Sequence, residues 1–306
     1  MAAWTTDDLV AEVKLRCGWP SAGGFMTDAE ILTIADSEMS GTVAPLIRRA
    51  REEFWVTTAP DVALVSGQSE YRVPSRALGS ALRDVLIAKG DTLYSAPELP
   101  PEEEHRFKTN AGPWHSPFGY FLQGSYLRIL PTPTSSDCSL RIKYYRRPSK
   151  LVPLSSTAKV SSASGTTITT EATVPSAWGT SETVDIIDSL SPYDSLGDDI
   201  AGTSIATTNV TVAAGVPSSV KAGDYVSLEG TTPVPQIPDA VRPVLVLATM
   251  RGCLDAAGDN EDAVKAEAQL NRQAARIGGL IEPRVTGERP VVINRYSALR
   301  GGGRRG

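Results

Sequence analysis

Apolar residues recur every three or four positions near both ends of the chain, which is the pattern of helices with one buried face. A first helix is predicted from about residue 5 to 17, with Thr5 or Thr6 as its cap. A second starts at the capping box of Thr27 and Glu30 and should kink at Pro45, because proline has no amide proton to donate. Its predicted buried stripe consists of Ile31, Ala35, Met39, Val43, Leu46, Ala50 and Phe54.

Helical periodicity returns at about residue 238. Pro238 or Asp239 should start this helix, and Gly258 should end it. Asp259 then caps a last helix, which the pair Gly278-Gly279 is expected to terminate. The predicted buried stripe of the last helix is Ala263, Ala266, Leu270, Ala274 and Ile277.

Between the helical ends the apolar period changes to two, which indicates β-strands. Gly124-Ser125 between two alternating runs predicts a tight hairpin. The expected strands of this central β region are 62–65, 70–73, 82–88, 92–95, 118–123, 126–130 and 139–145.

Residues 155–234 differ from the rest in composition. Serine and threonine supply 28 of these 80 residues, there is no arginine, and two lysines face nine acidic residues. Strand-like pieces at 166–170, 183–187, 210–213 and 225–228 are separated by Gly, Pro, Ser and Asp. This pattern predicts a small, separate all-β domain.

The predicted fold class is therefore α+β, with an antiparallel helix bundle formed by both chain ends, a central β region and an inserted small all-β domain. Residues 1–154 and 235–281 would form the core of bundle and β region, and 155–234 the Ser/Thr-rich insertion. Residues 282–306 would be an extended basic C-terminal tail, since 284–306 hold six arginines against one glutamate in a chain of net charge −5.

The sequence offers little that resembles enzyme chemistry. The run Glu102-Glu103-Glu104-His105 places carboxylates beside an imidazole, but a solvated helix start is the simpler interpretation. Asp198-Asp199 and the pair Asp185 and Asp188 lack the spacing of a calcium loop. We therefore expect no catalytic residue, no cofactor and no metal. We also expect no membrane partner, because no apolar run approaches the ~20 residues of a membrane span. Arg141, Lys143, Arg146 and Arg147 are expected to form an exposed strand face or a subunit contact.

Several stretches, taken in order, resemble the head-to-tail adaptor proteins of tailed bacteriophages, also called connector or head-completion proteins, including the tail accessory factors of short-tailed phages. FMTDAEIL at 25–32 resembles the opening of the family's long helix, and YRVPSRA at 71–77 resembles one of its strands. Further stretches with this resemblance are 82–85, 119–122, LRILPTP at 127–133, IKYYRRP at 142–148 and Ile237-Pro238. Residues 155–234 depart from the smaller members.

The resemblance implies a structural virion protein at the head–tail junction, assembled in the host bacterial cytoplasm and without catalysis. It implies a dodecameric ring, docked on the portal protein, whose channel passes genomic DNA without sequence-specific binding. Downstream tail or nozzle proteins are the expected further partners, and a tail fibre could be another.

The C-terminal tail is the candidate portal-binding site, because its apolar residues would be exposed in a segment that cannot build its own core. The candidate residues are Arg289, Val291, Val292, Ile293, Arg295, Tyr296, Leu299 and Arg300.

Two other functions stay open at this point. A tail or fibre-attachment protein could use the insertion to bind carbohydrate or another tail protein, and carbohydrate binding would require exposed rings from Trp178, Tyr193 or Tyr225. A tail enzyme that degrades the cell wall would need a pair of acids in a cleft, which the sequence does not locate.

Overall fold

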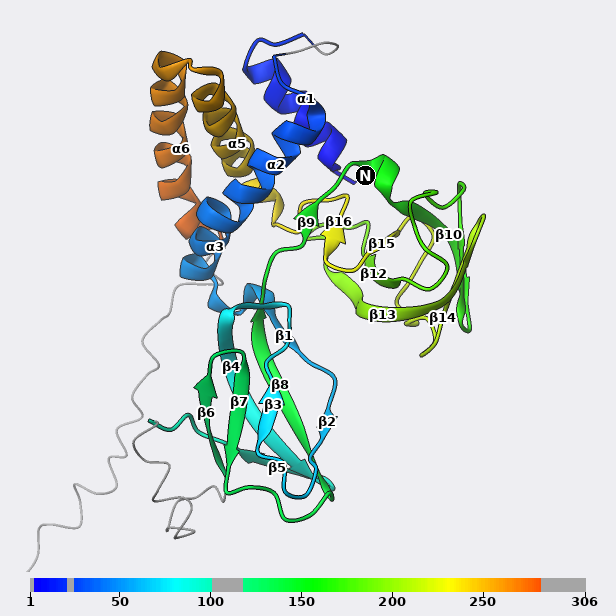
Figure 1. Cartoon of the computed structure of the whole chain (residues 1–306). Helices are drawn as coiled ribbons and strands as arrows, with labels where there is room; N and C mark the ends of the chain where they lie inside the picture. Colours follow the sequence, from blue (N-terminus) through cyan, green and yellow to red (C-terminus); the bar gives the residue numbers. More distant parts are fainter. Residues whose placement is uncertain (1–2, 21–24, 101–117, 282–306) are drawn as a thin grey trace, which may run out of the picture.

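The computed structural model describes residues 3–20, 25–100 and 118–281. Helices from both chain ends lie together, an open β region projects from one end of them, and a small barrel lies to their side (Figure 1). The α+β class predicted from the sequence is confirmed.

Both N-terminal helices begin where their capping residues predicted. Helix α1 spans Thr6–Arg16, and α2 spans Asp28–Glu38. The side chain of Thr27 accepts the amide of Glu30 at 3.3 Å, and the Glu30 carboxylate accepts the amide of Thr27 at 2.7 Å. A second capping box joins Thr5 and Asp8 in the same way. These boxes satisfy amides that a helix start leaves without partners.

The expected kink at Pro45 takes the form of a π-helical turn, η1 (Met39–Val43), before the short helix α3 (Ala44–Ala50). A π turn adds one residue to the helical repeat and so rotates the next helical segment about the helix axis. Ile47 is consequently buried, while Leu46 of the predicted stripe is only half-buried. The predicted continuation to Phe54 was wrong: α3 ends at Ala50 and leads into a 3₁₀ turn, η2 (Glu52–Trp55).

The C-terminal helices are α5 (Arg242–Ala257) and α6 (Asn260–Ile281), joined at Gly258, whose φ of +80° favours glycine. The prediction that Gly278-Gly279 ends the last helix was wrong. Ile277 and Ile281 lie one turn apart and are both buried. Burying Ile281 offsets the cost of about 1 kcal/mol for each helical glycine.

Helices from both ends share one hydrophobic core. Helix α5 contributes the most residues and contacts α1, α2 and α6. Representative members are Leu9, Val13, Ile31, Met39, Ile47, Val244, Leu247 and Leu270.

The β region consists of two open sheets around a second core. One sheet has the order β1-β8-β4-β5, with β2 also paired to β8, and the other has the order β3-β7-β6. The predicted hairpin at Gly124 joins β6 to β7, and the side chains of Leu140, Ile142 and Tyr144 share the buried face of β8 as their alternation predicted. The strands are β1 (Val56–Thr58), β2 (Val62–Ala63), β3 (Glu70–Arg72), β4 (Ala77–Lys89), β5 (Thr92–Ser95), β6 (Gly119–Gln123), β7 (Tyr126–Leu130) and β8 (Cys138–Arg146).

Residues 158–228 form a closed six-stranded barrel with the order β10-β11-β14-β13-β12-β15. Its interior is filled mainly by small branched side chains and one tryptophan. The strands are β10 (Ala158–Ser164), β11 (Thr167–Thr170), β12 (Thr183–Ile187), β13 (Ser195–Ala206), β14 (Asn209–Val212) and β15 (Tyr225–Leu228).

The chain enters and leaves the barrel side by side. Strand β9 (Lys150–Leu151) pairs in parallel with β16 (Thr231–Thr232), directly before and after the barrel. An insertion between adjacent ends of a core would have this geometry, and the domain boundaries remain a prediction. No helix within the described ranges has both the length and the apolar character needed to cross a bilayer.

Candidate functional site

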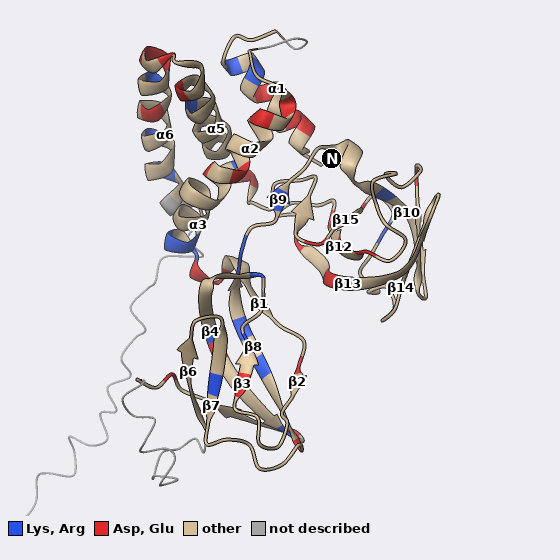
Figure 2. Cartoon of the chain, in the orientation of Figure 1, with Lys and Arg blue, Asp and Glu red and all other residues tan. Residues whose placement is uncertain are grey.

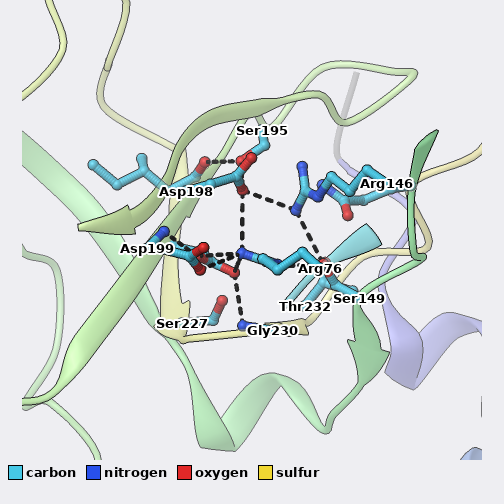
Figure 3. Close-up of polar contacts among 12 residues, drawn as sticks. Arg76, Arg146, Ser149, Ser195, Asp198, Asp199, Ser227, Gly230 and Thr232 are labelled. Atoms are coloured by element: carbon cyan, nitrogen blue, oxygen red, sulfur yellow. Dashed lines mark hydrogen bonds and ion pairs between the residues drawn. The ribbon is translucent and has the colours of Figure 1, made fainter. Parts of the chain in front are cut away.

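The most unusual cluster in the described part of the chain is built around Arg76, a buried arginine of the β region that reaches the barrel (Figure 3). Arg76 occupies the turn between β3 and β4, where Ala77 pairs with Arg146 of β8. This register sets Arg76 and Arg146 next to each other. We call Arg76, Arg146, Ser149, Asp185, Asp198 and Asp199 the Arg76 cluster.

Arg76 donates to three carboxylates that all belong to the barrel. Its Nη1 lies 2.8 Å from Asp185, 2.9 Å from Asp199 and 3.4 Å from Asp198. Asp185, on β12, has no solvent exposure and also accepts the amides of Asp199 and Gly230, each at 2.9 Å. Asp199 has a φ of +54°, a conformation that aspartate tolerates better than most residues. The barrel thus supplies the acids, and the β region supplies the cation.

Arg146 closes the cluster on its second side. Its Nη2 lies 2.9 Å from Asp198, and Ser149 accepts from both Arg76 and Arg146 at 3.1 Å. The expectation that Arg146 belongs to an exposed strand face was therefore wrong, because β8 ends at the barrel and buries it. Arg141 and Lys143, further down β8, remain partly exposed and pair with Asp61 and Asp84.

Burial and charge act against each other on these groups. Burial by itself lowers the pKa of Arg76, but Asp185, Asp198 and Asp199 outweigh it and raise that pKa. Burial lowers the pKa of Arg146, which Asp198 opposes. Burial raises the pKa of Asp185, while Arg76 and the two amides oppose the rise. Arg76 is therefore held charged, and this partner from outside the barrel offsets part of the cost of burying Asp185.

A second polar contact fastens the barrel to the helices. The hydroxyl of Tyr193 accepts the amide of Trp4 at 2.9 Å and Nη2 of Arg242 at 2.6 Å. The carbonyl of Tyr193 accepts from the side chain of Gln236 at 3.0 Å. Tyr193 is buried in a small apolar cluster with Ile187, Tyr225 and Val234. The barrel is thus fixed to the β region by Arg76 and to the helical layer by Tyr193.

Neither contact has the layout of a catalytic centre. The Arg76 cluster combines two cations, three carboxylates and one hydroxyl that bond to one another, which suits rigid attachment. Within the described residues no group of His, Cys, Asp and Glu side chains could hold a metal ion. The run at 102–105 lies outside the described residues.

The sequence-predicted portal-binding residues, from Arg289 to Arg300, also lie outside the described residues. Sequence reasoning missed the Arg76 cluster. One signal for it was present: residues 155–234 carry nine acids against two lysines and no arginine, an excess of acids that favours pairing with a cation from another part of the chain.

The three aromatic residues of the barrel segment are all buried. Trp178 packs inside the barrel and donates to the carbonyl of Ser156 at 3.2 Å, while Tyr193 and Tyr225 are buried in the small cluster with Ile187 and Val234. Every residue from 155 to 234 is described, so this segment offers no exposed aromatic ring for stacking on a sugar.

Comparison with known proteins gives one family. The sequence model of the SU10 adaptor protein family matches residues 4–187, which is 184 of the 306 residues. The match covers α1 to α3, the β region and the barrel as far as β12, and so includes most of the Arg76 cluster. No curated protein matches the chain.

Proposed function

Because the chain belongs to the SU10 adaptor protein family, we propose that it joins the portal of a phage head to the tail. The family is one of phage structural adaptor proteins, and membership implies a component of the virion. The family match carries the proposal. In it, copies form a dodecameric ring docked on the portal, with downstream tail or nozzle proteins below and genomic DNA passing through the channel.

The architecture supports an adaptor role. The helices of both ends, proposed as an antiparallel bundle, form one body, and the β region and the barrel extend from it in different directions (Figure 1). Three connected parts give one subunit several surfaces for different neighbours. An overall charge of −5 favours a conduit that does not retain DNA, because like charges disfavour phosphate binding.

We further propose that the C-terminal tail holds the portal and that the protein is not an enzyme. Val291 to Ile293 has high β propensity and could add to a strand edge of the portal, while Arg289, Arg295 and Arg300 could pair with its acidic groups. A ring repeats such a contact at each position, so weak single contacts add up to stable attachment.

The test is truncation after Ile281. The shortened protein should keep the helical circular dichroism signal of the full chain but fail to co-sediment with the portal rings of the same phage. Replacing Arg289, Arg295 and Arg300 by alanine should weaken binding in a salt-dependent way. A matched control replaces the exposed arginines Arg49, Arg72 and Arg147 by alanine and should bind normally. Normal binding by the truncated protein would place portal attachment elsewhere.

The alternative of a carbohydrate-binding tail protein has no support in the barrel, whose aromatic side chains are buried. Direct imaging separates the two functions. Electron microscopy of virions with labelled protein should place it at the head–tail junction, and a position at fibre tips would favour the alternative.

A further inference from the structure

The exposed residues Ala11 and Leu15 of α1 form an apolar stripe with Trp19, which follows the end of the helix and is half-buried against Phe25 and the helical core. Ala11, Leu15 and Trp19 lie at intervals of four residues, and Leu15 is 78% exposed. The same three residues line a groove of about 470 Å³ together with Val10, Asp7, Lys14 and Asp28, and the last two form an ion pair.

The outward face of α6 carries a second, shallower stripe. Val264 is 66% exposed, and Ala268 and Ala275 are exposed on the same side of the helix. Small side chains on a helix allow another helix to approach closely. Arg272 and Arg276 flank this stripe, and within the described residues neither has a carboxylate within salt-bridge distance.

Helices α1 and α6 lie on opposite flanks of the helical layer and run in opposite directions. Helix α1 rises from the barrel side toward the far end of the layer, whereas α6 descends from that end toward α3 (Figure 1). Along each of the two helices, acidic residues come first and basic residues follow (Figure 2). Asp7 and Asp8 start α1 and Lys14 and Arg16 end it, while Glu261 and Asp262 start α6 and its two arginines lie in the second half.

We infer that the α1 stripe of one copy binds the α6 stripe of the next copy, so that the two helices pack antiparallel. In that arrangement Leu15 lies opposite Val264, and the acidic start of α1 lies opposite Arg272 and Arg276. The spacings agree, because Asp8 to Leu15 covers about 10 Å of helix and Val264 to Arg272 about 12 Å. The basic end of α1 then lies opposite Glu261, which shares a side of α6 with Val264.

This contact is heterologous, since it joins two different surfaces of identical chains. Heterologous contacts close into rings when the rotation between copies allows it. The inference rests on the proposed function for the ring itself, and it adds which helices meet at each boundary between copies.

Cross-linking tests this directly. Leu15→Cys and Val264→Cys are combined in a background in which Cys17 and Cys138 are alanine, and the protein is assembled on portal rings of the same phage. A short thiol cross-linker should give a ladder of multimers on a denaturing gel, because each copy links to two neighbours. Either cysteine alone should give no ladder. The pair Leu190→Cys and Val264→Cys is the matched control, since Leu190 is also exposed (60%) but lies just after β12 of the barrel.

Charge insertion gives an independent readout. Leu15→Asp and Val264→Asp should each weaken self-association at least tenfold in analytical ultracentrifugation, whereas Leu190→Asp should not change it. Rings that form on the portal without a ladder, and that tolerate both substitutions, would overturn the inference and leave the proposed function intact. Failure of the wild-type chain to form any ring would overturn both.

Discussion

The molecule contains two β structures that differ in how their sheet edges are treated and in how their cores are filled. The β region has open sheets with edge strands and a core rich in tyrosine and leucine, whereas the barrel is closed and filled mainly by valine, isoleucine and alanine. A closed barrel has no edge to which another strand can add, so it cannot take part in assembly by strand addition. Of these two β structures, only the β region has strand edges that a neighbour could extend.

The two structures also differ in how they use charge. Ion pairs of the β region, such as Arg141 with Asp61 and Lys143 with Asp84, lie at the surface and join residues of the same region. The barrel instead buries Asp185 and receives Arg76 from outside. Surface pairs stabilise little, whereas a buried charge that loses its partner is costly. The barrel therefore depends on the β region for its position, while the β region has no such dependence on the barrel.

The largest test of this asymmetry is to remove the barrel. Residues 157–229 would be replaced by a short Gly/Ser linker, which keeps the pairing of β9 with β16 and joins ends that already lie side by side. Helices and β region should still fold, because their cores contain no barrel residue. The helical circular dichroism signal and co-sedimentation with portal should both persist. Unfolding of the helices would show that residues 155–234 are not a separable domain.

Breaking the Arg76 cluster should have the next largest effect. Arg76→Met leaves Asp185 buried beside an apolar side chain and should lower the free energy of unfolding by about 3–5 kcal/mol. The measurement is chemical denaturation monitored by circular dichroism. Arg83→Ala, which removes an exposed arginine of β4, is the matched control and should change stability far less. Adding Asp185→Asn to Arg76→Met should recover part of the loss, and equal losses in the Arg76 and Arg83 variants would contradict the asymmetry.

Local patterns explain why the β region was easier to predict than the barrel. The hairpin at Gly124 and the alternation of Leu140, Ile142 and Tyr144 depend on neighbours in sequence. Strand β13 was missed because its residues are mostly small or polar, and register shifts interrupt its pairing with β12 and β14. Pairing partners, rather than its own propensity, make it a strand.

Contacts between residues far apart in the sequence were not predicted, for a related reason. Arg76 and Asp185 are 109 residues apart, and no spacing rule connects them. The π turn before Pro45 moved the buried face from Leu46 to Ile47, although the proline correctly marked the irregularity. The capping box at Thr27 was predicted correctly, and Thr5 was one of the two caps predicted for the first helix. Caps can be predicted because they join residues only three positions apart.

The contact between barrel and helices should be weaker than the Arg76 cluster. Tyr193→Phe removes the acceptor for the amide of Trp4 and for Arg242, and should cost about 1–2 kcal/mol because both groups are partly buried. Arg242 keeps Asp239 as a partner, which limits the loss. Tyr126→Phe is the matched control, because the Tyr126 side chain is half exposed. Chemical denaturation of both variants measures the difference, and a loss as large as that of Arg76→Met would mean that Tyr193 is the main attachment.

The smallest expected effect is a difference in how the two β structures respond to acid. The hydrogen bond from Arg141 lowers the pKa of Asp61 below its ordinary value of 3.8, so this carboxylate stabilises the fold above about pH 4 and loses that contribution as pH falls through its folded pKa. Burial raises the pKa of Asp185, so its contribution has the opposite sign: it is present below about pH 4 and is lost as pH rises through the folded pKa.

Thermal midpoints of unfolding at pH 7 and pH 3 measure both contributions. Asp61→Asn should reduce the fall in midpoint on acidification, and Asp185→Asn should increase it. Arg141→Ala should remove the effect of Asp61→Asn, because without the guanidinium there is no shift to lose. A smaller acid response in the Asp185 variant would show that Arg76 and the two amides outweigh burial, and that the barrel is held in the same way as the surface pairs of the β region.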